Sequence, residues 1–130
     1  MLKILVFLAL TSLSFEIYEK DIQLHCLTTN IYYEARDEPL NGQLAVALVT
    51  KNRAAKSNIC NVVYAKHQFS WTSKFNKTKR DNVSWSNAEH IAKISLAYNY
   101  SFYATHYHSK YVNPNWNMKK IAIIGNHIFY

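Results

Sequence analysis

Two glutamates four residues apart stand out in the stretch NIYYEARDEP, which spans residues 30–39. The chain has only eight acidic residues, and Pro39 directly follows the second of these two glutamates, Glu38. A residue that precedes proline avoids the α region, so a helix is expected to end at or just before Glu38. Glu34 would then lie in the last helical turn, where the negative end of the helix dipole raises the pKa of a carboxyl group.

A carboxyl group that keeps its proton near neutral pH can act as a general acid toward a glycosidic oxygen. The tyrosines beside Glu34 could raise its pKa further by removing water from it. The spacing alone slightly favours a different interpretation, a surface ion pair of Glu34 with Arg36 or of Glu38 with Arg53. A catalytic role and a surface ion pair therefore both remain open as interpretations of this motif.

Three histidines near the C-terminus are a second candidate for chemistry. His106 and His108 form an H-x-H pattern, which on a strand places both rings on one face, and His127 could be a third ligand for zinc. No H-E-x-x-H motif and no cysteine cluster accompanies them. Rings that line a polar cleft or make hydrogen bonds in the core are the simpler interpretation, and a zinc site is the alternative.

Aromatic and amide residues recur together in QFSW (68–71) and YVNPNW (111–116). Aromatic rings stack on sugars or bases, and amides bind hydroxyl and N-acetyl groups. The net charge of +7 suits an anionic polymer, either a cell-wall glycan or a nucleic acid. The sequence contains no zinc finger, RNP-type signature or recognition-helix pattern.

The N-terminus, MLKILVFLALTSLSFE, has the pattern of a secretory signal. Lys3 precedes an apolar run at 4–10, and Ser12 and Ser14 place small residues at the −3 and −1 positions of a cut after Ser14. The run is shorter than the ~20 apolar residues of a membrane span. We predict a signal peptide at residues 1–14 and an exported protein, with an uncleaved anchor or a buried N-terminal helix as the alternative.

The chain has two cysteines, Cys26 and Cys60. A single pair in an exported protein is usually oxidised, whereas a reactive or metal-binding pair would suit a reducing compartment better. The predicted disulfide closes a loop of about 35 residues, which contributes roughly 3–4 kcal/mol in the chain-entropy description.

The length of 130 residues fits one domain, residues 15–130 after the predicted signal. Periodicity predicts helices over 21–34 and 43–56, the second nearly apolar all round, and a third over 86–100 with Ser86 as N-cap and Glu89 completing a capping box. Residues 62–71 are expected to begin as a helical turn and finish extended, and strands are expected within 104–112 and 119–130. The predicted fold class is α+β, with three main helices followed by a small antiparallel sheet.

Five stretches, in order, resemble the SleB-type cell-wall hydrolases, the family of spore-cortex-lytic enzymes and related bacterial and phage proteins. These stretches are NIYYEARDEP, GQLAVA with VTKNR, CNVVY with HQFSW, ATHYHS with NPNW, and IGNHIFY, and together they cover the chain from about residue 26 to its end. The resemblance implies a compact lysozyme-related fold that cleaves peptidoglycan between N-acetylmuramic acid and N-acetylglucosamine, by lytic transglycosylation. We expect no cofactor and a monomer.

Matching the family motif residue by residue implies Glu34 as the catalytic acid and base, with Glu38 as a possible second carboxylate. The resemblance also implies that the glycan groove is lined by Gln68, Phe69, Ser70, Trp71, His106, Tyr107 and His108. Two alternatives stay open: a zinc N-acetylmuramoyl-L-alanine amidase that uses the three histidines, and a wall-binding protein without catalysis.

The family motif has glycine where this chain has Asp37. If that position needs a positive φ, aspartate adopts it at some cost. A third acid beside the site could raise the pKa of Glu34 by like-charge repulsion, or it could mark a weaker enzyme.

Overall fold

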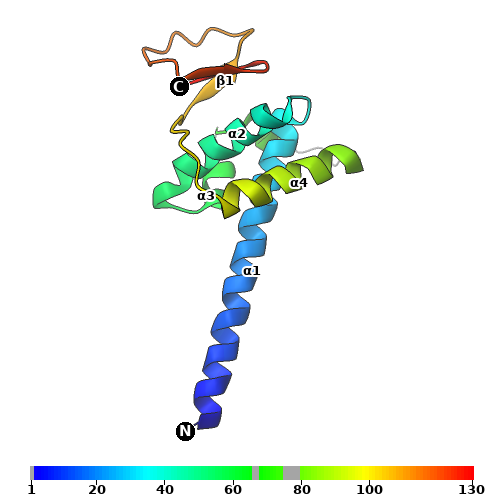
Figure 1. Cartoon of the computed structure of the whole chain (residues 1–130), viewed down its shortest axis with the longest axis vertical. Helices are drawn as coiled ribbons and strands as arrows, with labels where there is room; N and C mark the ends of the chain where they lie inside the picture. Colours follow the sequence, from blue (N-terminus) through cyan, green and yellow to red (C-terminus); the bar gives the residue numbers. More distant parts are fainter. Residues whose placement is uncertain (1, 66–67, 75–79) are drawn as a thin grey trace.

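The computed structural model describes residues 2–65, 68–74 and 80–130. Helices come first and a small sheet follows, as predicted for an α+β domain (Figure 1). The elements are α1 (Leu2–Ala35), α2 (Leu40–Arg53), η1 (Ala54–Lys56), α3 (Ile59–Val63), η2 (Ser70–Lys74), α4 (Asn82–Ala97), β1 (Tyr107–Ser109), β2 (Ala122–Ile124) and β3 (His127–Phe129).

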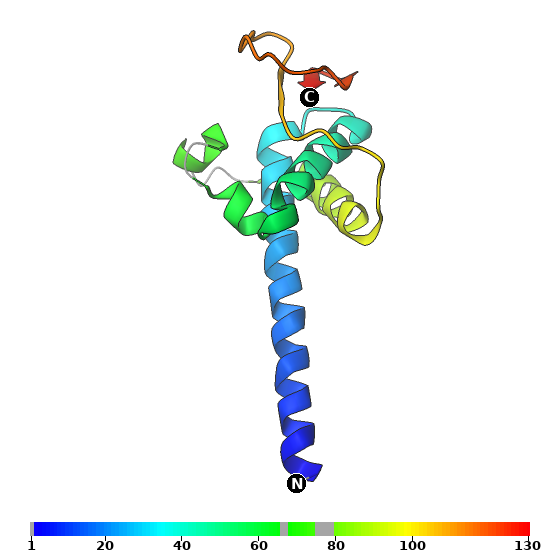
Figure 2. The ribbon, with the colours of Figure 1, turned by 90° about the vertical axis from the view of Figure 1, so that its left-hand side faces the viewer.

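Helix α1 is far longer than the predicted helix over 21–34. Its N-terminal half projects away from the other elements, and the sheet lies at the opposite end of the molecule (Figures 1 and 2). Apolar side chains on the projecting half, including Leu8, Leu13 and Phe15, are exposed. The predicted signal peptide lies within this half, and its cleavage remains a prediction. In the part of the chain that the structure describes, no helix has the length and apolar character needed to cross a membrane.

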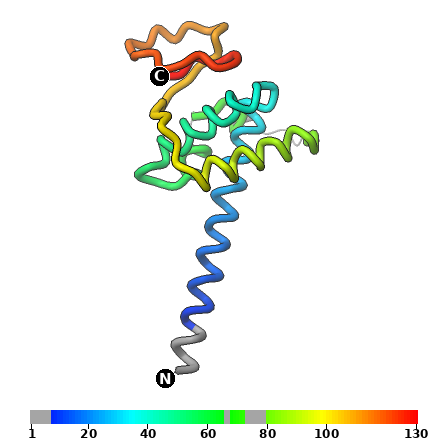
Figure 3. The backbone as a smooth tube through the Cα atoms, viewed as in Figure 1, coloured from blue at the N-terminus to red at the C-terminus, as the bar shows by residue number. Residues whose placement is uncertain are grey.

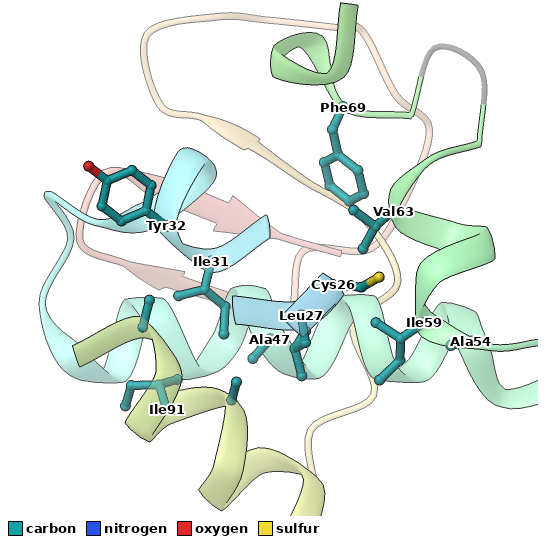
Figure 4. Packing of buried hydrophobic residues seen from close by; sticks show 12 residues of the cluster. Cys26, Leu27, Ile31, Tyr32, Ala47, Ala54, Ile59, Val63, Phe69 and Ile91 are labelled. Carbon is teal, nitrogen blue, oxygen red and sulfur yellow. The ribbon is translucent and has the colours of Figure 1, made fainter. Parts of the chain in front are cut away.

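The C-terminal half of α1 forms the core with α2 and α4. Leu27 and Ile31 of α1 are fully buried, and Ala47 of α2 packs in the same cluster with Ile91 of α4 (Figure 4). Burying one such leucine or isoleucine side chain stabilises a fold by about 2–3 kcal/mol. Helix α2 is buried along most of its length, which confirms its prediction as the central helix.

The disulfide between Cys26 and Cys60 is confirmed. It joins the core half of α1 to α3, and the Cα atoms of the two residues lie 5.3 Å apart. The bridge therefore fixes α3 to the helix that ends in the NIYYEARDEP motif.

Helix α4 begins four residues before the predicted N-cap, Ser86. Its N-cap is Asp81, whose carboxylate accepts hydrogen bonds from the backbone N–H groups of Val83 and Ser84 at 3.3 and 3.0 Å. Glu89 lies inside the helix and pairs with Lys93 at 3.1 Å, so the predicted capping box is wrong. Aspartate caps as well as serine does, and its site lets one more helical turn form.

The expected extended end of residues 62–71 is also wrong. Helix α3 occupies the start of this stretch, and Ser70 and Trp71 lie in the 3₁₀ helix η2. Residues 66–67, between the two, lie outside the described residues.

The sheet has the order β1-β3-β2, with both pairs antiparallel, and pairs Tyr107 with Phe129 and Ser109 with His127. Its strands lie beside the end of α1 and the start of α2 (Figure 3). Phe129 is fully buried against a second apolar cluster that includes Ala35 and Val46. The sheet therefore covers the end of α1, where Glu34 lies.

Candidate active site

Glu34 is the penultimate residue of α1, in the last helical turn as predicted. Its Oε2 atom accepts a hydrogen bond from the Tyr107 hydroxyl of β1 at 2.8 Å. Burial raises the pKa of Glu34 above its ordinary value, and the Tyr107 hydrogen bond opposes part of that rise by stabilising the carboxylate. The carboxyl group is thus both oriented by a neighbour and biased toward its protonated form.

The surface ion pairs offered as the alternative for this motif do not form. Arg36 lies 3.8 Å from the carboxylate of its neighbour Asp37, and Glu38 lies 3.9 Å from His127, which is charged only when protonated. Within the described residues, neither Glu34 nor Glu38 pairs with an arginine.

Glu34 opens into a cleft of about 420 Å³ whose walls come from α1, α2, the residues around η2, and the chain from β1 onward. Five of the seven residues predicted for the glycan groove line it. The lining residues are Glu34, Arg53, Gln68, Phe69, His106, Tyr107, His108 and Trp116.

The other two predicted groove residues, Ser70 and Trp71, do not line this cleft. The Trp71 ring stacks on Tyr33 with centroids 4.8 Å apart, and its Nε1–H donates to Oδ1 of the buried Asn30 at 3.1 Å. Trp71 therefore supports α1 one turn before the catalytic candidate, because the η2 helix turns its ring toward the core.

Trp116 and Tyr130 complete an aromatic wall that the site prediction omitted. The Trp116 ring meets His106, His108 and Tyr130 edge-on at 5.4–5.7 Å. His108 stacks on Tyr130, and its Nε2 lies 2.9 Å from the Tyr130 hydroxyl. The NPNW and IGNHIFY motifs contain both residues, so the motifs were the signal for them.

Glu38 lies almost completely buried, with 8% of its side chain exposed. Its Oε2 accepts the backbone N–H of Asn126 at 2.8 Å, and its Oε1 lies 3.9 Å from His127 Nδ1. Gly125, in the β2–β3 turn, has φ +58°, and a side chain there would collide with the Glu38 carboxylate. Glu38 therefore clamps this turn against the junction between α1 and α2.

The three histidines of the alternative zinc site separate into two places. His106 and His108 line the cleft, whereas His127 lines a smaller polar cavity of about 170 Å³ beside Glu34 and Glu38. Burial lowers the pKa of His127, although the Glu38 charge opposes the shift. No group of three potential metal ligands occurs in residues 2–65, 68–74 and 80–130, so the proposed zinc triad is not formed.

Asp37, which replaces the family glycine, does not adopt a positive φ. Asn115 is the one residue other than glycine that does so in the described part of the chain. The side chain of Asp37 is 94% exposed. The concern that this position strains the backbone was therefore wrong.

The Cell Wall Hydrolase family matches residues 37–130, a segment that begins three residues after Glu34. Two solved structures share the fold, each over 82% of this chain. The catalytic domain of the germination-specific lytic transglycosylase SleB from Bacillus anthracis has a TM-score of 0.67, 23% identity and 92% of its own length covered. For the catalytic domain of the Bacillus cereus SleB protein, these values are 0.63, 21% and 88%.

No curated protein matches the sequence. The family match nevertheless covers well over half of the chain and includes the sheet, the aromatic wall and most of the cleft. On this ground the chain belongs to the Cell Wall Hydrolase family.

Proposed function

We propose that this protein is a lytic transglycosylase that cleaves peptidoglycan glycan strands, with Glu34 as its single general acid and base. The observation that carries the proposal is the state of Glu34: a partly buried carboxyl group with a raised pKa that opens into the cleft and is held by Tyr107. Membership of the family and the fold shared with the SleB catalytic domains support it.

The chemistry requires two proton transfers at one carboxyl group. Protonated Glu34 donates its proton to the glycosidic oxygen as the bond from that oxygen to C1 of N-acetylmuramic acid breaks. The resulting carboxylate then takes the proton of the sugar's own 6-hydroxyl while O6 bonds to C1. The product is a 1,6-anhydro ring, Glu34 regains its proton, and no water is consumed.

The position of the second carboxylate favours this route over ordinary hydrolysis. Glycosidases that use water or a covalent intermediate need two carboxyl groups facing the scissile bond. The Glu38 carboxylate is bound to the Asn126 N–H and does not line the cleft. Glu34 is the one carboxylate among the described residues of the cleft.

The remaining walls suit a chain of N-acetylated sugars. Trp116 offers an exposed apolar ring for stacking, the buried Phe69 closes the cleft with apolar surface, and the Gln68 amide with the imidazoles of His106 and His108 offers hydrogen-bonding groups. We assign these residues to substrate binding, together with the ring of Tyr107. Ser70 and Trp71 have no part in this assignment.

Mass spectrometry of fragments released from purified sacculi tests the proposal. The wild type should release anhydromuramic ends and be indifferent to chelator, and Glu34→Gln should abolish release while keeping the thermal stability of the fold. Asp37→Asn, which removes an exposed carboxylate three residues away, is the matched control and should retain activity.

Other products would contradict the proposal in distinguishable ways. Reducing ends would indicate a hydrolase, new amino-terminal alanine with chelator sensitivity would indicate an amidase, and binding to sacculi without released fragments would indicate a wall-binding protein. Full activity of Glu34→Gln would remove Glu34 from the mechanism.

We further propose that the protein acts outside the cytoplasm after removal of residues 1–14. The wall substrate, the Cys26–Cys60 disulfide and the exposed apolar residues of the projecting helix support export. N-terminal sequencing of the protein recovered outside the cell should read from Phe15, and an N-terminus at Met1 would contradict cleavage.

A further inference from the structure

We propose that Arg53 is a specificity residue that binds a carboxylate of the peptide stem on N-acetylmuramic acid. This inference rests on the proposed action on peptidoglycan, and it adds a binding site for the peptide stem beside the glycan cleft. Two independent features of the described residues carry it: a cation that has neither a carboxylate partner nor a hydrogen bond, and a second cavity that this cation also lines.

Arg53 is the last residue of α2, and its side chain is half-buried in the wall of the cleft that Glu34 shares. Its guanidinium lies 5.7 Å from the Phe69 ring centroid. Within the described residues it has no carboxylate partner and no hydrogen bond. A guanidinium has five N–H donors in a planar fork that matches a carboxylate, so a half-buried one without a partner is suited to an anionic ligand.

A second cavity, of about 240 Å³, shares the lining residues Arg53 and Gln68 with the glycan cleft. Its other lining residues are Ser57 and Asn61, whose side chains are hydrogen-bonded to each other at 3.3 Å, and the apolar Val62 and Ala65. Arg53 therefore lines both cavities, and its side chain is placed to serve a ligand that extends from the glycan cleft toward the side cavity.

Peptidoglycan is a branched polymer. Each N-acetylmuramic acid carries a lactyl group and peptide stem beside the bond that is cleaved, and the stem carries free carboxylates. A strand seated at Glu34 would send its stem to one side of the cleft. The side cavity offers space for that branch, and Arg53 offers the charge that its carboxylate requires.

A structural role for Arg53 makes a different prediction. A cation in the last turn of a helix is stabilised by the helix dipole, and this guanidinium also contacts Phe69. If Arg53 served only these contacts, replacing it would slow cleavage of charged and neutral substrates by the same factor.

Three preparations of sacculi separate the two roles: stems intact, stem carboxylates amidated by carbodiimide coupling to methylamine, and stems removed by an amidase, which leaves the shorter lactyl carboxylate. For the wild type, amidation or stem removal should lower kcat/KM for fragment release by about 10- to 100-fold, the usual cost of losing a charge-assisted contact. Arg53→Gln should cleave all three preparations at the same low rate.

Arg53→Lys keeps the charge without the fork and should recover part of the discrimination between intact and amidated stems. Lys93→Gln, which removes an exposed charge on α4, is the control for net charge and should match the wild type. Melting temperatures of the variants show whether each is folded.

Equal losses for Arg53→Gln on intact and amidated sacculi would overturn the proposal. Wild-type preference for the stripped preparation would also overturn it, because the ligand would then be the lactyl carboxylate. Failure of the proposed function is visible separately, as an absence of anhydromuramic ends in the wild-type products.

Discussion

Tyr107→Phe is the most informative single change near Glu34, because it removes one hydroxyl and keeps the ring that helps to bury the carboxyl group. The Tyr107 hydroxyl donates to Glu34 Oε2 at 2.8 Å and stabilises the carboxylate, which lowers the pKa of Glu34 against the effect of burial. Without this donor, burial acts unopposed and the pKa of Glu34 rises further.

The sign of the pH effect follows from the role of Glu34. A general acid must be protonated, so activity is present below the pKa of Glu34 and is lost as the pH rises through it. The alkaline limb of kcat/KM should therefore move to higher pH in Tyr107→Phe. A loss of the hydroxyl that merely loosened the site would lower the whole profile without moving this limb.

The same substitution has a cost in stability. A hydrogen bond to a partly buried carboxyl group contributes about 1–2 kcal/mol, so the melting temperature should fall by about 4–8 °C for a domain of this size. Tyr103→Phe is the control, since its ring is 77% exposed and its hydroxyl has no hydrogen-bond partner among the described residues. An alkaline limb that stays in place or moves to lower pH would refute the role of Tyr107 in setting the pKa of Glu34.

Changes at Glu38 and at the Cys26–Cys60 disulfide test the structure around the site. Glu38→Ala should lower the free energy of unfolding by about 1–3 kcal/mol, because it leaves the N–H of Asn126 without its acceptor, whereas Glu38→Gln should keep most of the stability and the wall lysis. A folded Glu38→Gln protein as inactive as Glu34→Gln would make Glu38 a catalytic residue instead. Replacing Cys26 and Cys60 by serine should cost about 4 kcal/mol, estimated from the sequence separation of 34, and lower the melting temperature by roughly 15 °C. Unchanged urea unfolding of this double variant would contradict that estimate.

Local signals in the sequence predicted the features that depend on few residues. Pro39 predicted the end of α1 to within a few residues, and the apolar run of α2 predicted that this helix is central. The chain has two cysteines, so the predicted disulfide had one possible pairing. The start of α4 was missed because Asp81 and Ser86 are both good N-caps, and local patterning does not decide which one starts the helix.

Features that depend on distant residues could not be predicted from spacing. Tyr107 is 73 positions from Glu34, and Asn126 is 88 positions from Glu38. From the sequence, the helix dipole was the first reason expected for a raised pKa of Glu34, and loss of water beside the tyrosines was the second. In the structure, burial is the cause that raises the pKa of Glu34. Arg53 was considered only as a surface partner of Glu38, although it lies in the VTKNR stretch of the family resemblance, and spacing alone does not predict that it faces the cleft.

Burial also decides whether Asp37, where the family motif has glycine, affects the pKa of Glu34. Like-charge repulsion would raise the pKa of Glu34 only if the two carboxylates shared a poorly hydrated space, and the side chain of Asp37 is 94% exposed, where water and salt screen its charge. The backbone at this position is not in the left-handed region, so glycine has no conformational advantage there. The glycine that the site does require is Gly125, which has φ +58° and leaves the space that the Glu38 carboxylate occupies. A substitution at position 37 is therefore compatible with an active enzyme. A side chain at position 125 would instead displace the Glu38 carboxylate, whose hydrogen bond to Asn126 holds the β2–β3 turn beside Glu34.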